Sequence, residues 1–249
     1  MAMIRGVLNR ATSCCRKLYA FPNYLSMNFM SKGFWTDGWR ENSLMPNESG
    51  LRQCACGTFV KLKDMIDIRE KEKSNLPRMD HIPAELLQDC IKQAKDEDME
   101  VLARFAYWRH ANHEYREIYK AHREAEELEN KVNWDASQKN AQSWWKRALR
   151  LSTPKYERTA ASPFTVPPFK PSAAQIDNMT RLSEQLLTAQ KLKPSSNALN
   201  LAELYRELGR FEEAQFPINQ IPDDERGTTS KIINEHIDKQ ETALIRFRM

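Results

Sequence analysis

Apolar positions in the last quarter of the chain recur at the three- and four-residue spacing of an amphipathic helix. Within residues 200–214 they form one stripe of Leu201, Leu204, Tyr205 and Leu208. Gly209 follows the stripe and can end a helix in the left-handed conformation, which a residue with a Cβ adopts only at a cost. A second helix is expected after it, cut short by Pro217 and Pro222. Ala202, Tyr205, Gly209 and Ala214 fall where a tetratricopeptide repeat places small and aromatic packing residues.

Similar stripes predict further helices that start near His81, near Asp98, and at about 136–151, 173–192 and 227–247. Residues 113–132 alternate acids and bases, which is typical of a solvated helix face supported by charge pairs. Residues 18–68 differ, because Asp37-Gly38 between aromatic residues indicates a hairpin and 58–68 suits a closing strand. The expected fold is mainly α, with a small N-terminal head of short strands.

Prolines and charge suggest where the chain divides. Residues 153–172 contain five prolines and predict an extended connector. The expected regions are a basic arm plus head over 1–70, a helical region over 71–152, the connector, and a tetratricopeptide-like helical region over 173–249. Residues 1–36 carry five Lys or Arg and no acid. Because the whole chain has a net charge of +4, the chain after residue 36 is close to neutral. This start predicts an N-terminal arm of a cytoplasmic protein or, alternatively, an organelle-targeting segment.

The cysteines are the strongest chemical candidates. Cys14, Cys15, Cys54 and Cys56 form two close pairs separated by a loop, a set that can supply four thiolates to Zn²⁺. Four protein ligands would make the metal structural, a staple for a head with little core of its own. The alternative is a head in which aromatic packing has replaced the metal. Cys90 lies in a predicted helix and is expected to be a buried thiol.

Short motifs follow one another in a specific order: Trp35-Thr-Asp-Gly38, Met45-Pro46, Cys54-Ala-Cys-Gly57 and Glu203-Leu-Tyr-Arg-Glu-Leu-Gly209. In this order they resemble an uncharacterised bacterial family. The resemblance implies a zinc-ribbon-like head on a helical body that ends in a tetratricopeptide-like helical pair, and it implies no activity. The family has two Cys-x-x-Cys pairs, whereas Thr12 and Gln53 stand here where the first cysteines of those pairs belong.

Two functions are compatible with these patterns. The first is a non-enzymatic adaptor that docks a protein partner on the helical body, with Tyr205, Arg206 and Arg210 at the contact edge. The alternative is nucleic-acid binding by the basic arm, the cysteine head and the Trp144–Arg158 stretch, with Lys146, Arg147 and Arg150 near phosphates. The sequence contains no nucleophile elbow, phosphate-binding loop or dinucleotide motif, which favours a non-enzymatic role. The sequence has no run of about 18 apolar residues, the length that a membrane-spanning helix needs, so no membrane span is predicted.

Overall fold

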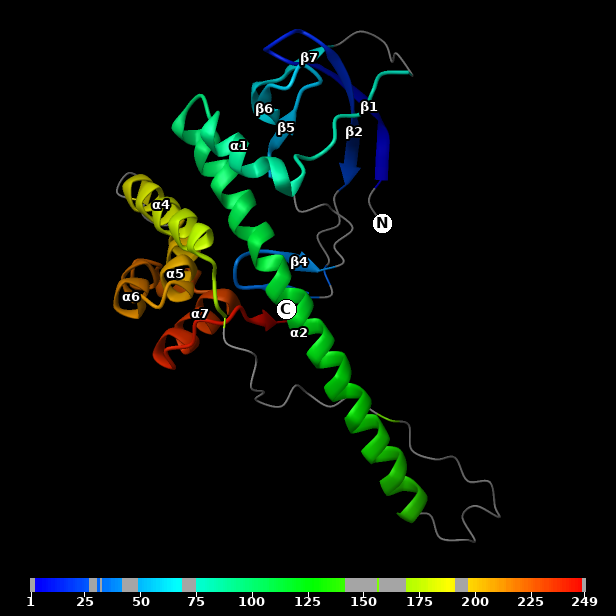
Figure 1. The fold of residues 1–249 in the computed structure, drawn as a ribbon, viewed down its shortest axis with the longest axis vertical. Helices are drawn as coiled ribbons and strands as arrows, with labels where there is room; N and C mark the ends of the chain where they lie inside the picture. The colour runs from blue at the N-terminus through cyan, green and yellow to red at the C-terminus, as the bar shows by residue number, and fades with distance from the viewer. Residues whose placement is uncertain are drawn as a thin grey trace. The chain divides into compact units, whose positions relative to one another are not determined.

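A computed structural model of the chain describes residues 3–26, 31, 33–41, 49–68, 75–141, 156, 169–190 and 197–247. The chain divides into two compact units (Figure 1). The first consists of Met1–Asn112 and Phe169–Met249, and the second of His113–Pro168. Helices dominate the described part, and most of the strands lie in the first 68 residues. The predicted class, mainly α with short N-terminal strands, is therefore confirmed.

The N-terminal part of the first unit is built from β-hairpins. Strands β1 (Met3–Ala11) and β2 (Leu18–Ser26) pair antiparallel, and β7 (Ile66–Ile68) adds to the other edge of β1. A second hairpin joins β5 (Leu51–Gln53) to β6 (Phe59–Lys61). The basic start of the chain is thus not a loose arm from Met3 onwards, because its backbone hydrogen bonds are made to β2 and β7.

A third small sheet joins segments from both ends of the chain. β3 (Gly33–Trp35) and β4 (Arg40–Glu41) form the hairpin predicted at Asp37-Gly38, and Gly38 has the positive φ of +81° that such a turn uses. β8 (Arg246–Phe247) pairs with the other edge of β3. The prediction of a helix reaching Phe247 is therefore wrong, since the last helix ends at Asp238 and the chain returns as a strand.

The described helices are α1 (Leu87–Lys92), α2 (Glu97–Ala141), α4 (Ala173–Gln190), α5 (Ala198–Glu207), α6 (Phe211–Asn219) and α7 (Thr228–Asp238). The Asp96 carboxylate accepts a hydrogen bond of 2.8 Å from the Met99 amide and caps α2. The separate helix predicted from about 136 is instead part of α2. No glycine or proline interrupts residues 97–141, so nothing in the sequence stops the helix there.

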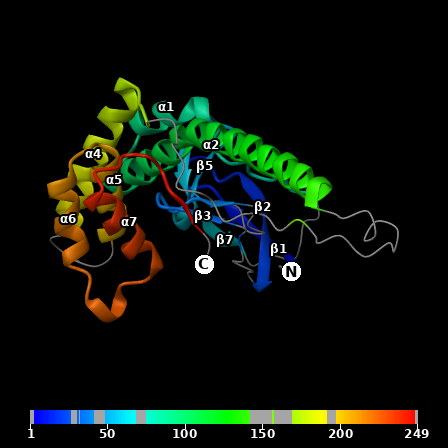
Figure 2. The same ribbon diagram turned by 90° about the horizontal axis from the view of Figure 1, so that it is seen from below.

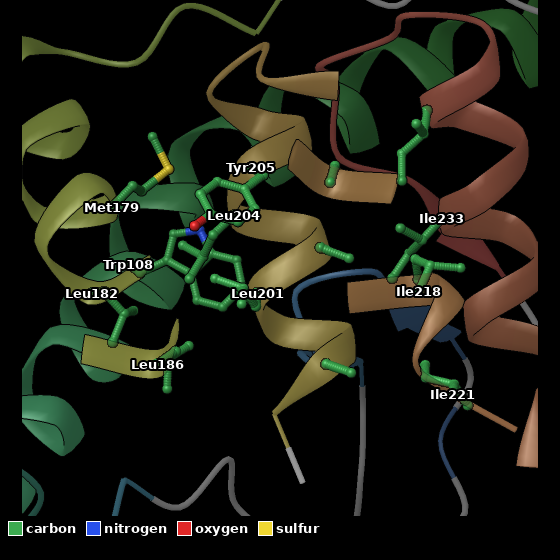
Figure 3. Packing of buried hydrophobic residues seen from close by; sticks show 14 residues of the cluster. Trp108, Met179, Leu182, Leu186, Leu201, Leu204, Tyr205, Ile218, Ile221 and Ile233 are labelled. Atoms are coloured by element: carbon green, nitrogen blue, oxygen red, sulfur yellow. The ribbon is translucent and has the colours of Figure 1, made fainter. Parts of the chain in front are cut away.

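Four helices of the first unit surround its largest apolar core. α4, α5, α6 and α7 lie side by side (Figure 2). Figure 3 shows Trp108 from α2 and Leu182 and Leu186 from α4 directed toward Leu201 of α5, and all four are buried. Gly209, with a φ of +73°, ends α5 in the left-handed conformation that the sequence predicts. The helical hairpin α5–α6 is confirmed, and its likeness to a tetratricopeptide repeat stays a prediction.

Within the described residues, no helix combines the length and the apolar character needed to cross a bilayer.

Candidate metal centre

Four sulfur atoms meet where the two N-terminal hairpins turn. The Sγ atoms of Cys14, Cys15, Cys54 and Cys56 all lie within 4.8 Å of one another. The closest approaches are 3.4 Å between Cys15 and Cys54 and 3.5 Å between Cys14 and Cys56. With Zn–S bonds of 2.3 Å, two sulfurs of a zinc tetrahedron lie about 3.8 Å apart. The predicted proximity of the four cysteines is confirmed, and their spacing fits a tetrahedral metal ion; no ion is present to identify the metal.

Two tight turns aim these sulfurs at one point. Between β1 and β2, the Arg16 amide donates to the Thr12 carbonyl at 3.0 Å, and Arg16 itself has a φ of +57°. Between β5 and β6, the Gly57 amide donates to the Cys54 carbonyl at 2.8 Å, and Gly57 has a φ of +86°. A left-handed residue therefore curls the backbone just after each cysteine pair. This curl lets Cys-Cys and Cys-x-Cys spacings bring both sulfurs of a pair to the same side.

The surroundings of the cluster favour a thiolate at its buried position, Cys54. Burial raises the pKa of Cys54, but hydrogen bonds from the Cys56 amide and the Tyr19 hydroxyl outweigh it, and the pKa falls to about 6. The Thr58 hydroxyl lies 3.4 Å from the Cys56 sulfur and lowers the pKa of that thiol. In contrast, burial and hydrogen bonds with neighbouring thiols raise the pKa of Cys14 to about 11. A Cys54 thiolate at neutral pH would attract a cation to the cluster.

Thr12 and Tyr19 complete the surroundings of the sulfurs, and the sequence analysis did not anticipate either role. Thr12 is fully buried, with its Oγ1 atom 3.6 Å from the Cys15 sulfur and 3.7 Å from the Cys54 sulfur. The Tyr19 hydroxyl lies 3.5 Å from the Cys54 sulfur and accepts a hydrogen bond of 2.8 Å from the Ala55 amide. Hydroxyls in such positions orient metal-bound sulfurs and reduce their charge density. Thr12 therefore lies where its hydroxyl can support the neighbouring sulfurs.

The residues expected at a partner-binding edge lie in different environments. Arg206 is fully buried and forms an ion pair of 2.6 Å with Glu203. Tyr205 is 6% exposed and belongs to the apolar core. Arg210 is exposed, and its guanidinium lies 4.8 Å from the centre of the Tyr205 ring. Of the three, Arg210 is thus the one that presents its charged group to solvent.

Other expected positions lie outside the described residues. These are Lys146, Arg147 and Arg150 of the nucleic-acid alternative, Trp144 and Trp145 beside them, and the Met45-Pro46 motif.

A buried polar cluster connects the Trp-Thr-Asp-Gly turn to the helices. Asn112 of α2 donates to the Asp37 carboxylate at 3.2 Å and to the Glu207 carboxylate at 3.3 Å. Trp108 donates to Glu207 at 2.8 Å. Burial, with the nearby carboxylates of Glu203 and Asp37, holds the pKa of Glu207 well above its ordinary value. The Asp37 side chain also accepts a hydrogen bond of 3.0 Å from the Trp39 amide, which is the turn-forming role expected of it.

No family model, no curated protein and no solved structure matches the chain. The cysteine cluster is compatible with a zinc-ribbon-like head, and the resemblance to a bacterial family stays a prediction.

Proposed function

We propose that the protein is a non-enzymatic adaptor, in which a structural zinc ion fixes the head and the helical body docks a protein partner. The observation that carries the proposal is the four-sulfur cluster. Four thiolates fill the coordination shell of Zn²⁺ and leave no position for a substrate or an activated water. The metal would therefore shape the head and take no part in a reaction.

A groove on the helical body supports the docking half of the proposal. It has a volume of about 460 Å³ and lies along α6, α7 and the short turn between them. Ile218 lines it together with charged residues of both signs, among them Arg226, Lys231, Glu235 and Asp238. Because Ile218 is almost fully buried, the accessible lining is charged and polar, and it suits a partner segment of complementary charge. Exposed Arg210, at the start of α6, lies on the same helical hairpin.

The metal half is tested by measuring metal content on protein purified without a chelator. We expect about one zinc ion per chain, by mass spectrometry, because four thiolates complete one tetrahedron. The Cys54→Ser/Cys56→Ser variant should lose it, whereas Cys90→Ala, which removes a buried thiol outside the cluster, should retain it. A wild-type protein without any bound metal would overturn the structural-metal proposal.

The docking half is tested by comparing proteins that co-purify with the full chain from its native cells. A partner captured by the wild type should be lost from Lys231→Glu, which reverses a charge in the groove. It should remain with Lys92→Glu, which reverses an exposed charge on α1. Equal capture by all three proteins would exclude the groove. Capture of nucleic acid that weakens steeply with salt would instead support the alternative function.

A further inference from the structure

The second unit contains the C-terminal part of α2, and one face of this part carries exposed apolar side chains. Ile118, Leu128 and Val132 are 47%, 64% and 58% exposed. Ala121 and Ala125 lie between them along the helix and are also exposed. We call these five residues the α2 stripe. Large aliphatic side chains gain free energy when they leave water, so a row of them on one helix face indicates a binding surface.

The spacing of the α2 stripe is that of a coiled coil. Its members follow one another at intervals of three, four, three and four residues, which are the a and d positions of a heptad. Residues at other heptad positions make contacts inside the unit: Arg123 pairs with Glu126, and the Trp134 ring packs edge-on against Tyr156 at 5.5 Å. The stripe is therefore a distinct face of the helix. We propose that it binds the α2 stripe of a second copy of this chain, with the two helices antiparallel.

Side-chain volume favours the antiparallel arrangement. In a parallel, in-register pair, Ala121 and Ala125 would each meet the same alanine of the second copy, and two adjacent layers would be poorly filled. In an antiparallel pair, Ala125 lies opposite Leu128 and Ala121 lies opposite Val132. Each of these layers occurs twice, by symmetry. In these four layers a small residue faces a large one, and the two helices pack closely along the middle of the stripe, whereas Ile118 lies opposite Asp135 at each end.

Charge leads to the same arrangement. Glu124 and Lys131 each occupy a g position beside the stripe, and both are exposed. In the antiparallel pair, Glu124 of one copy faces Lys131 of the other, and this attraction also occurs twice. In the parallel pair, Glu124 faces Glu129, an e-position carboxylate of the same sign. The observed charges therefore stabilise one orientation and oppose the other.

The length of the stripe sets the expected strength. From Ile118 to Val132 a helix rises about 21 Å, which is little more than two heptads. This is shorter than the roughly three to four heptads typical of an independently stable coiled coil. We therefore expect a reversible dimer that dissociates in the micromolar range, so that occupancy depends on protein concentration.

Sedimentation equilibrium of the full chain, from low to several hundred micromolar, tests the dimer. The wild type should fit a reversible monomer–dimer equilibrium. Leu128→Glu should weaken it at least about tenfold, because each of two central layers loses its largest side chain. Ile176→Glu on α4, a site 44% exposed, is the matched control and should leave it unchanged. Circular dichroism should show the same helix content in all three proteins, since every replaced side chain faces water in the monomer.

Charge reversals test the orientation. Lys131→Glu alone should weaken the dimer about fivefold, because two attractions become repulsions. Adding Glu124→Lys to it should restore the wild-type equilibrium, because each pair is then attractive again with its signs exchanged. A double variant as weak as the single one would overturn the antiparallel arrangement. A wild type that stays monomeric throughout, or a dimer that Leu128→Glu leaves intact, would overturn the proposal itself.

Discussion

The cysteine head and the helical body of the first unit are stabilised by different means. Among the described residues, the apolar core beside the cysteines contains Tyr19, Cys54, Val60, Met65 and Met79, and Leu51 and Phe59 of the β5–β6 hairpin pack into a separate core with residues of α1 and α2. The core of the helical body contains fourteen buried residues, with Trp108, Leu182 and Leu201 among its most enclosed side chains. A small core seldom stabilises a β-hairpin head alone, and a metal ion is one common supplement. The body needs no such supplement, because its own apolar burial supplies the driving force.

Each of the two regions also contains a polar cluster, and negative charge is neutralised differently in the two clusters. In the head, Cys14, Cys15 and Cys56 are exposed, so a cation from solution can reach the sulfurs. In the body, Arg206 supplies the cation from inside, next to Glu203, and burial keeps Glu207 toward its protonated form. The cysteine cluster is open to solvent and would take its positive charge from a bound cation. The buried cluster of the body is closed, and the positive charge of Arg206 balances the carboxylate of Glu203.

The largest expected effect comes from removing the zinc ion that we propose the four cysteines bind. In zinc-finger peptides a structural zinc ion contributes about 10–16 kcal/mol of apparent binding free energy, most of which drives folding. A strong chelator should therefore release β1, β2, β5 and β6, whereas α4, α5, α6 and α7 stay folded. Hydrogen–deuterium exchange measured by mass spectrometry would separate the two regions. Equal loss of protection in both would show that head and body unfold together and would contradict the comparison.

The next largest effect should follow Arg206→Ala. Removing this guanidinium leaves the buried Glu203 carboxylate without its positive partner and, among the described residues, with only the Thr36 hydroxyl as a hydrogen-bond donor. It also removes hydrogen bonds to the Glu241 and Ala243 carbonyls. Breaking a buried ion pair on one side costs about 3–5 kcal/mol of unfolding free energy. Arg210→Ala, at an exposed arginine, should cost less than about 1 kcal/mol. Urea denaturation followed by circular dichroism would compare the unfolding free energies of the two variants. A similar loss in both would argue against a stabilising role of the buried Arg206 charge.

Glu207→Gln should have little effect near pH 4 and an effect that grows as the pH rises. Because the folded protein holds the pKa of Glu207 well above that of the unfolded chain, ionisation disfavours the folded state. Wild-type stability should therefore fall as pH rises above the unfolded value of about 4.3, by at most about 1.4 kcal/mol per pH unit. Glutamine does not ionise, so the variant should match the wild type near pH 4 and exceed it at pH 8. Parallel stability profiles from urea titrations would refute this.

Local features of the fold could be predicted from the sequence, and non-local ones could not. The turn at Gly38, the end of α5 at Gly209 and the Asp96 cap each depend on a few adjacent residues. In contrast, β8 forms because the distant strand β3 pairs with it, and its short, arginine-containing sequence carries only a weak alternating pattern. Strand formation at such sites is decided by the partner strand.

The candidate site shows the same division. The four cysteines are visible from their residue type and pairing, whereas the supporting roles of Thr12 and Tyr19 depend on the approach of two hairpins. From the sequence, Arg206 is predicted at the partner-contacting surface of the helical body, whereas the structure buries it. Its spacing of three residues from Glu203 allows a helical ion pair, which is the one local sign that it can be buried.

The pairing of β8 with β3 has a consequence for the order in which the protein folds during synthesis. β3 leaves the ribosome before any of the described helices, but its partner strand is made only after α7. The Phe34 ring packs on Phe247 at 6.0 Å, and the Thr36 amide donates to the Ile245 carbonyl. Until then this edge of β3 is unpaired, and the first unit closes after nearly all of its chain has been translated. The first unit can therefore complete its folding only after the C-terminal segment has been synthesised, although most of its helices can form earlier.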